Sequence, residues 1–262
     1  MKSFLIKLYL ILSSQFGIDP LRFVRSIRRF PSFLYDWWKF RKLYTGRLTF
    51  VPCLHDRYEE GGVTKSEYFW QDLLVSRSIH KANPLKHLDI GSRIDGFVSH
   101  VASFREIEVI DVRPISTQIP GVTFFQADLM KESSLINGID RKGYYDSISC
   151  LHAIEHFGLG RYGDPIDVHG HEKGIANISS LLKPGGVLYL STPIGIERVE
   201  FNANRVFSPN TIINIAKQHN LVLESLIIIT NGEINEVTAD IATLKKLAEE
   251  KYNLGIFTFK HL

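Results

Sequence analysis

The sequence predicts an α/β protein in which helices cover both faces of a mostly parallel sheet. Short apolar runs alternate with amphipathic helical stretches from about residue 85 onward, and several of the runs end at a glycine or an acidic residue. Such alternation is typical of parallel sheets built from strand–helix–strand units. Hydrophobic residues make up 44% of the 262 residues and charged residues 23%, which excludes a disordered chain, a collagen and a disulfide scaffold.

Each expected strand is short, apolar and bounded by turn residues. Strands are expected at residues 85–90, 107–111, 122–126, 145–151, 187–192, 221–230 and 256–260. Helices are expected at residues 94–104, 173–182, 208–219 and 240–252. Ser208 is the expected N-cap of one of these helices, with Pro209 in its first turn.

Three regions are expected along the chain. Residues 1–45 form a basic, aromatic helical extension, residues 46–84 a connecting helical segment, and residues 85–262 the α/β domain. The extension is predicted to hold two or three short helices, broken near Gly17–Pro20 and at Pro31. The connecting segment is predicted to contain a helix over residues 66–80.

Positive charge is concentrated in the extension. Residues 1–50 hold ten Lys or Arg against two Asp, although the net charge of the whole chain is only +3. Cations mixed with Trp, Tyr and Phe suit an anionic membrane surface, and a helical cap packed on the main domain is the alternative. No nucleic-acid-binding motif is present, so nucleic acid is not an expected partner.

The cysteines and the N-terminus predict the cellular compartment. Cys53 and Cys150 lie far apart and outside any CxxC motif, which predicts a reducing environment. Lys7 interrupts the N-terminal apolar stretch, and no small-residue cleavage site follows, so no secretory leader is expected. We therefore expect a cytoplasmic protein with peripheral contact to the inner face of the membrane.

Ligands of such sheets bind at the carboxyl ends of the strands, near the point where strand order reverses. After the first strand, Gly91 and Gly96 have the outer spacing of GxGxxG, but Arg93 takes the middle position and argues against NAD or FAD. Asp111 at the end of the second strand can accept both ribose hydroxyls of an adenosine. Asp128 can accept from the adenine amine, and turn or capping roles are the alternative for both acids.

The order of these strand ends resembles class I methyltransferases that use S-adenosylmethionine. The resemblance covers about residues 85–230 and rests on Asp89-x-Gly91, Asp111, Ala127-Asp128-Leu129 and the Leu-Lys-Pro-Gly-Gly turn at residues 182–186. It implies a Rossmann-like class I methyltransferase fold with a mostly parallel seven-stranded sheet and an N-terminal helical extension. The blocks at residues 88–97, 151–164 and 193–209 resemble, more narrowly, an uncharacterised family known only as a domain of unknown function, whose members often sit with surface-polysaccharide genes.

The resemblance also implies contacts for S-adenosylmethionine. Asp89 and Gly91 would line the methionine end, Asp111 the ribose and Asp128 the adenine. The expected cofactor set is completed by Ser92, Arg93 and Leu151. Arg93 can also pair with the cofactor carboxylate, because guanidinium suits bidentate contacts.

In the resembled fold, the segment after the fourth strand faces the methyl group. Transfer to a hydroxyl needs a base, and His152, Glu155 and His156 are the candidates. His156 is preferred because it lies farther from the strand and closer to the expected substrate loop. A structural histidine is one alternative. The other is a metal site in which His152 and His156 at i, i+4 spacing are joined by His169, His171, Asp164 or Asp167, although no HExxH motif is present and no metal is predicted.

Two polar loops, over residues 158–170 and 193–207, follow strands at the expected active edge. Their acids, amides and arginines suit a sugar or a sugar phosphate, and a self-satisfied, salt-bridged loop is the alternative. The expected substrate-binding residues are Arg161, Tyr162, Asp164, Arg198, Glu200, Asn202 and Arg205.

The sequence therefore predicts an S-adenosylmethionine-dependent methyltransferase that O-methylates a small-molecule or lipid-linked glycan precursor in surface-polysaccharide synthesis. One alternative is a catalytically inactive binding or scaffold protein, indicated by Arg93 and Asp95 in the glycine loop. The other is a different glycan-modifying transferase, with or without a metal, indicated by the histidine cluster.

Overall fold

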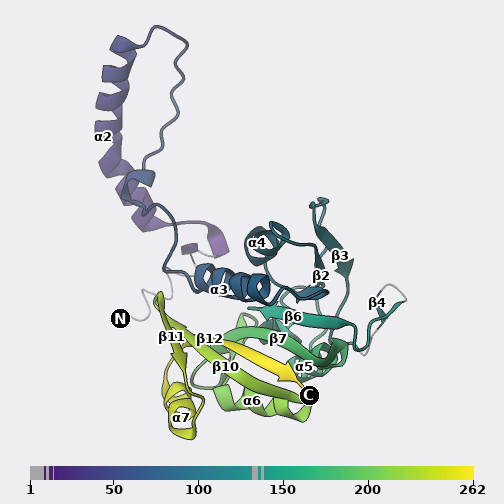
Figure 1. Ribbon diagram of the computed structural model, residues 1–262. Helices are drawn as coiled ribbons and strands as arrows, with labels where there is room; N and C mark the ends of the chain where they lie inside the picture. Colours follow the sequence, from purple (N-terminus) through teal and green to yellow (C-terminus); the bar gives the residue numbers. More distant parts are fainter. Residues whose placement is uncertain (1–8, 10–11, 14, 132–134, 137–138) are drawn as a thin grey trace. The chain divides into compact units, whose positions relative to one another are not determined.

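The computed structural model describes residues 9, 12–13, 15–131, 135–136 and 139–262 (Figure 1). The chain divides into two compact units, Met1–Val63 and Thr64–Leu262. The first unit contains helix α2 (Pro20–Leu43) and the short turn η1 (Asp56–Tyr58). Helix α3 (Glu67–Ala82) belongs to the second unit, so the expected separate connecting segment over residues 46–84 is divided between the two.

The second unit contains one mixed sheet of eight strands, in the order β11-β10-β12-β7-β6-β1-β2-β3. Its parallel part consists of β3 (Val122–Gln126), β2 (Ile107–Asp111), β1 (His87–Ile90), β6 (Tyr145–Leu151) and β7 (Leu182–Ile194). Its antiparallel part consists of β12 (Asn253–His261), β10 (Leu221–Thr230) and β11 (Glu233–Val237). All seven expected strands are present, which confirms the predicted fold class.

Strand β11 was not expected from the sequence. It pairs with β10 as a hairpin whose two loop residues, Asn231 and Gly232, have φ values of 52° and 85°. Positive φ at both positions is the geometry of the type I′ turn, for which Asn-Gly is a preferred sequence. Two shorter hairpins lie outside the main sheet, β4 (Leu135–Ile136) with β5 (Ile139–Asp140) and β8 (Arg198–Glu200) with β9 (Asn204–Val206).

Helices cover both faces of the sheet, as predicted (Figure 1). On one face lie α5 (Gly170–Leu181), α6 (Pro209–Gln218) and α7 (Ile241–Glu249), and their fully or nearly buried apolar side chains join one core cluster. On the other face lie α3, the π-turn η2 (Ile94–Val98) and α4 (Ser99–Ala102). Val75 and Ile79 from α3 pack there with Phe97 and Val101, so α3 is part of the domain that carries the sheet.

Helix α2 is one continuous helix of 24 residues, and the predicted break at Pro31 was wrong. The Asp19 carboxylate caps its start by accepting from the Leu21 and Arg22 amides, and basic residues complement the dipole in its last turn. At Pro31 one backbone donor is lost, and the neighbouring Ser32 hydroxyl donates to the Arg29 carbonyl. Over the described residues, no helix combines the length and apolar character needed to cross a bilayer.

The topology places several loops at one edge of the sheet. Strand β1 lies between β2 and β6. From β1 the chain adds β2 and β3 on one side and then continues with β6 and β7 on the other side. This reversal opens a crevice beyond the carboxyl ends of the parallel strands. The loops that follow β1, β2, β3 and β6 meet there.

Candidate functional site

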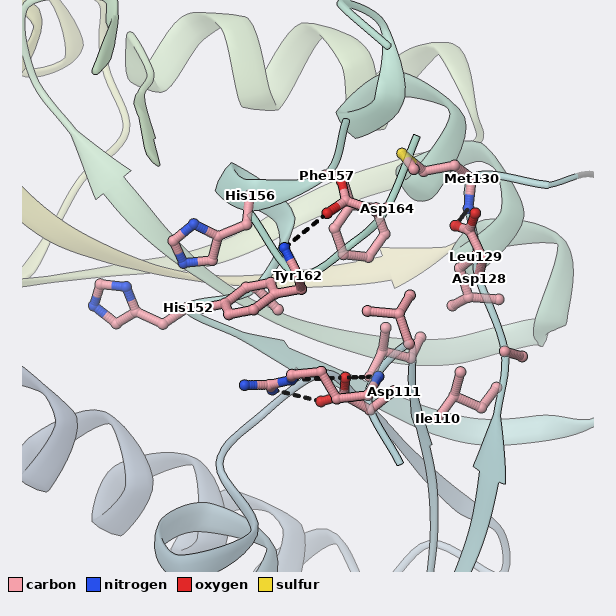
Figure 2. A pocket seen from close by; sticks show the side chains of 16 residues that line it. Ile110, Asp111, Asp128, Leu129, Met130, His152, His156, Phe157, Tyr162 and Asp164 are labelled. Atoms are coloured by element: carbon pink, nitrogen blue, oxygen red, sulfur yellow. Dashed lines mark hydrogen bonds and ion pairs between the residues drawn. The ribbon is translucent and has the colours of Figure 1, made fainter. Parts of the chain in front are cut away.

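Two adjoining cavities, of about 50 and 410 Å³, open at the carboxyl ends of β1, β2, β3 and β6, and Figure 2 shows the smaller one. The larger volume is in the range that small-molecule ligands fill, and the smaller cavity adjoins it. The cavities share six lining residues, Gly91, Asp111, Arg113, His152, His156 and Tyr162. We call the two cavities together the strand-end crevice.

The turn after β1 depends on Gly91. Its φ is +70°, and a Cβ atom there would lie 3.0 Å from the Ala153 Cβ. Only glycine therefore allows both the left-handed turn and the close approach of the loop after β6. Ser92 and Leu151, also expected at the cofactor, line the larger cavity.

Arg93 lines the larger cavity but does not fill the turn. Its guanidinium pairs with the Asp95 carboxylate at 2.7 and 3.1 Å, and both side chains are largely exposed. The guanidinium also lies over the Tyr68 ring, 5.8 Å from its centre. The Arg93 charge at the rim of the turn is therefore already paired.

Asp89, expected at the methionine end of the cofactor, lines neither cavity. Its carboxylate is fully buried and accepts from the Ser92 hydroxyl at 2.6 Å, the Ser92 amide at 3.1 Å and the Ser149 hydroxyl at 2.6 Å. Burial raises its pKa to about 7. The Ser92 hydroxyl also accepts from the Leu151 amide, so Asp89 shapes the turn from beneath instead of contacting a ligand.

A buried histidine, which sequence reasoning missed, extends this polar chain. His87 lies 2.7 Å from the Ser147 hydroxyl through Nδ1 and 3.2 Å from the Ser149 hydroxyl through Nε2. Burial lowers its pKa to about 3, so the ring is neutral. Because the Ser149 hydroxyl donates to Asp89, it accepts from His87 Nε2–H, which leaves His87 Nδ1 to accept from Ser147.

Asp111 faces both cavities, as predicted, but it has an unexpected partner. Arg113 donates to its two carboxylate oxygens, with Nε 3.0 Å from Oδ1 and Nη2 2.6 Å from Oδ2. The Arg113 amide also donates to Oδ1 at 2.8 Å. The hydrogen-bonded carboxylate raises the pKa of the Arg113 guanidinium, which lies over the Tyr162 ring at 4.5 Å. The only sequence signal for this pair is the Asp-x-Arg spacing at a strand end.

Asp128 makes the turn that was the alternative expected for it, and it also lies at the crevice. One of its oxygens accepts from the Met130 amide at 2.9 Å, which makes the turn after β3. Asp128 also lines the smaller cavity beside Leu129 and Met130 (Figure 2). The turn thus fixes the carboxyl group at the wall of the crevice.

His152 is held between two carboxylates. Its Nδ1 lies 2.7 Å from Glu155 Oε1, and its Nε2 lies 3.3 Å from Glu67 Oε1. Burial alone would lower its pKa, but Glu155 and Glu67 outweigh burial and raise it to about 9. His152 is therefore an imidazolium at neutral pH and has no free nitrogen to accept a proton. Glu155, also a candidate base, is fully buried and is occupied by His152.

His156 has the opposite character. Its Nδ1 donates to the Ala203 carbonyl at 2.7 Å, and the ring lines both cavities (Figure 2). Burial, assisted by the nearby Arg161 cation and opposed by Glu155, lowers its pKa. The ring is thus neutral, with its lone pair on Nε2. Of the three predicted candidates, His156 alone combines the protonation state of a base with a place at the crevice.

The loop over residues 158–170 is organised by Asp164. Its carboxylate accepts from the amides of Gly158, Gly160 and Tyr162 at 2.9, 3.2 and 3.1 Å. This arrangement holds the Tyr162 ring edge-on to His156 at 5.5 Å. Arg161 lines the larger cavity and donates to the Ala203 carbonyl at 2.7 Å. Three of the expected substrate residues, Arg161, Tyr162 and Asp164, therefore meet at the crevice.

The other four expected substrate residues, Arg198, Glu200, Asn202 and Arg205, line neither cavity. Arg205 is only 5% exposed and donates to the backbone carbonyls of Phe157 at 2.6 Å and Glu155 at 3.3 Å. Arg198 pairs with Glu200 at 2.9 Å. The donors of Arg198 and Arg205 therefore hold the β8–β9 hairpin and its neighbouring loops in place.

The alternative metal site gains no support. Within the part of the chain that the structure describes, no three His, Cys, Asp or Glu side chains come together to hold a metal ion. His169 pairs with Glu172 at 3.1 Å, and His171 packs on Phe207.

The sequence and fold were compared with known proteins. Residues 130–226 match the family described as "Caenorhabditis protein of unknown function, DUF268", in agreement with the expected resemblance to an uncharacterised family. No curated protein matches the sequence significantly.

Two solved structures share the fold. The 1,6-didemethyltoxoflavin-N1-methyltransferase of Burkholderia thailandensis, with bound 1,6-didemethyltoxoflavin and S-adenosylhomocysteine, has a TM-score of 0.50 and 11% identity over 93% of this chain and 91% of that chain. A protein of Galdieria sulphuraria assigned as a sarcosine dimethylglycine methyltransferase has a TM-score of 0.52 and 13% identity over 73% of this chain and 85% of that chain. At these identities the likeness shows the fold, which is that of class I methyltransferases.

We predict that Gly158→Ala destabilises the protein more than Gly163→Ala. Both glycines have positive φ, so alanine costs about 1–2 kcal/mol at either site. A Cβ at Gly158 would also overlap the Asp167 carbonyl oxygen, whereas nothing lies within 4 Å at Gly163. Overpacking adds roughly 1–3 kcal/mol at Gly158. Chemical denaturation measures the difference, and equal losses in the two variants would contradict the described loop.

We predict that part of the stability is lost as pH rises from about 6.5 to about 9. The folded state keeps the His152 proton up to about pH 9, whereas the unfolded chain releases it near the ordinary value of 6.5. Raising the pH across this window therefore favours unfolding. Urea unfolding at several pH values should show this loss in the wild type and a smaller loss in His152→Gln. Imidazole NMR of the wild type gives an independent check, and a His152 pKa below 7 would refute the assignment.

Proposed function

We propose that this chain is an S-adenosylmethionine-dependent methyltransferase. The observation that carries the proposal is the pairing, across one crevice, of a strand-end carboxylate, Asp111, with a neutral histidine, His156. The class I methyltransferase fold supports the proposal, as does the S-adenosylhomocysteine present in the Burkholderia thailandensis structure.

The residues at the crevice fit this cofactor. Asp111 presents two carboxylate oxygens, which suit the two ribose hydroxyls. Asp128 at the wall of the smaller cavity suits the adenine amine, and Gly91 lines both cavities without a side chain that would keep the ligand away from the backbone. Arg93, on an exposed part of the same turn, uses Nε and Nη2 for Asp95 and can offer its remaining donors to the cofactor carboxylate.

When bound, S-adenosylmethionine supplies an electrophilic methyl group on sulfur. A hydroxyl acceptor that attacks this methyl group must lose its proton, and the neutral His156 Nε2 can take it. The Ala203 carbonyl keeps the proton on Nδ1 and so orients the ring for this task. His152 does not compete for the proton because it is already charged.

We propose that the acceptor is a hydroxyl of a sugar or glycan precursor, in surface-polysaccharide synthesis. The support is chemical: a hydroxyl needs a base in the way that His156 provides it, and the Tyr162 side chain lies beside His156 at the same wall. Arg161 adds donors at the same wall.

The inactive scaffold alternative was indicated by Arg93 and Asp95. In the structure these two side chains pair with each other at the exposed rim of the turn, and neither lines the smaller cavity that Asp111 and Asp128 share. The glycine loop thus offers no obstacle that would favour loss of activity.

Replacing Asp111 by Asn tests the cofactor assignment. The variant keeps the shape of the side chain but removes the charge that accepts from ribose hydroxyls, so we expect S-adenosylhomocysteine to bind about ten- to hundredfold more weakly. Glu106→Gln is the matched control because this exposed residue precedes the same strand and lines neither cavity. Calorimetric titration measures both, and unchanged binding by the Asn variant would overturn the assignment.

We also propose that helix α2 binds the anionic inner surface of the membrane. The helix holds seven Lys or Arg against one Asp and has no buried residue. Its C-terminal half pairs cations with aromatic rings, Lys42 with Trp38 at 3.4 Å and Lys39 with Tyr35 at 5.0 Å. Exposed aromatics with neighbouring cations match the chemistry of lipid headgroups.

Neutralising three exposed cations of α2 tests this proposal. At roughly 1 kcal/mol for each cation near an anionic surface, the triple variant Arg25→Gln, Arg28→Gln, Lys39→Gln should bind phosphatidylserine-containing vesicles about a hundredfold more weakly. The matched control neutralises Lys217, Lys245 and Lys246, which are exposed on α6 and α7. Vesicle sedimentation of the full chain gives the affinities, and equal loss in both triple variants would reject a specific role for α2.

A further inference from the structure

The Arg113 guanidinium occupies the carboxylate that the cofactor ribose needs. Its two donors take one oxygen of Asp111 each, at 3.0 and 2.6 Å. A ribose that engages both oxygens of Asp111 must displace this guanidinium, because the two ligands use the same fork of the carboxylate. The Arg113 amide bond to Oδ1 uses a separate lone pair and can persist.

A displaced Arg113 has no carboxylate waiting for it. Among the described residues, the other acids that line the crevice are already engaged. Asp95 stays paired with Arg93 through Nε and Nη2, and Asp164 accepts from three loop amides. Asp128 accepts from the Met130 amide through one oxygen, and its other oxygen is assigned to the adenine amine. The Arg113 side chain is 45% exposed and lines the larger cavity, so a released guanidinium stays available to an anionic ligand there.

A second guanidinium stands on the same aromatic ring. Arg161 lies 5.3 Å from the centre of the Tyr162 ring, and Arg113 lies 4.5 Å from it. Arg161 donates to the Ala203 carbonyl, and within the described chain no carboxylate forms an ion pair with it. Both arginines line the larger cavity beside His156. Two cations around one ring, close to the proposed base, form a site for a ligand with two negative charges.

We infer that cofactor binding exchanges ions at the crevice: the ribose takes Asp111, and the released Arg113 joins Arg161 around Tyr162 to bind a phosphate or diphosphate group of the acceptor. The inference rests on the proposed function and deepens it, since it names the acceptor as a phosphorylated or diphosphate-linked molecule. Guanidinium groups bind phosphate bidentately, and two of them match a dianion. The cofactor therefore binds first and creates the acceptor site.

Calorimetry with inorganic pyrophosphate tests the exchange in the full chain. We expect saturating S-adenosylhomocysteine to raise the pyrophosphate affinity by about tenfold, in the range usual for coupled sites, and pyrophosphate to raise the S-adenosylhomocysteine affinity by the same factor. In Arg113→Gln the coupling should disappear. The same variant should bind S-adenosylhomocysteine about two- to fivefold more tightly, because a competing, partly exposed ion pair is gone.

Two further variants sharpen the test. Arg161→Gln should weaken pyrophosphate binding in the presence of S-adenosylhomocysteine. Arg77→Gln, on an exposed part of α3 outside both cavities, should change neither affinity nor coupling. Malonate serves as a carboxylate probe, and coupling with malonate but not with pyrophosphate would overturn the phosphate assignment.

The failures of the two proposals are distinguishable. If the wild type binds S-adenosylhomocysteine but pyrophosphate affinity is independent of it, the exchange is refuted and the cofactor assignment stands. If Arg113→Gln weakens S-adenosylhomocysteine binding, Arg113 holds the cofactor itself and the exchange is also refuted. If the wild type does not bind S-adenosylhomocysteine at all, both proposals fall.

Discussion

The buried Asp89 carboxylate is the contact on which the crevice depends. It lies at the switch point of the sheet, where it accepts from Ser92 in the turn after β1 and from Ser149 in β6. A buried carboxylate is costly unless it is hydrogen-bonded, and three donors offset that cost here. The same contacts fix the Gly91 turn against the loop after β6, so the walls that carry Asp111 and His156 keep their spacing.

Two histidines four residues apart show that surroundings, and not residue type, decide chemical character. His152 lies between Glu67 and Glu155 and is held as a cation, whereas His156 is buried beside a carbonyl and Arg161 and is held neutral. The cationic His152 and the neutral His156 thus line the same crevice. This arrangement suits a reaction in which His156 accepts one proton while the charge of His152 stays constant.

Local patterns in the sequence predicted the sheet, because strand length, apolar runs and turn residues are set by neighbours in the chain. The strand-end positions of Gly91, Asp111 and Asp128 followed from the same pattern. The Asn231-Gly232 turn carried an equally local signal for β11, and the prediction overlooked it. Helix α2 continues through Pro31, so a proline in the sequence does not by itself mark the end of a helix.

What the sequence did not predict is how side chains pair across long distances in the chain. Arg205 bonds carbonyls 48 and 50 residues away, so a cation that looks available for substrate is consumed by structure. His152 also meets Glu67 of α3, 85 residues away in the chain, and this contact adds to that of the neighbouring Glu155 in raising the His152 pKa. No periodicity or motif encodes such pairings, since they exist only once the topology brings the segments together.

The polar contacts in and around the crevice differ in how much stability is lost when each is broken. This difference separates contacts that maintain the structure from contacts that a ligand can replace. The bonds of Asp89 and Arg205 are buried and locked by several partners, so exchanging one partner leaves a polar group unsatisfied. The Asp111–Arg113 pair is half open to solvent on the arginine side and needs only a side-chain rotation to part. In the absence of a ligand, Arg113 holds the Asp111 carboxylate in the geometry that binding requires. A ligand can then replace Arg113, so the carboxylate is both preorganised and available.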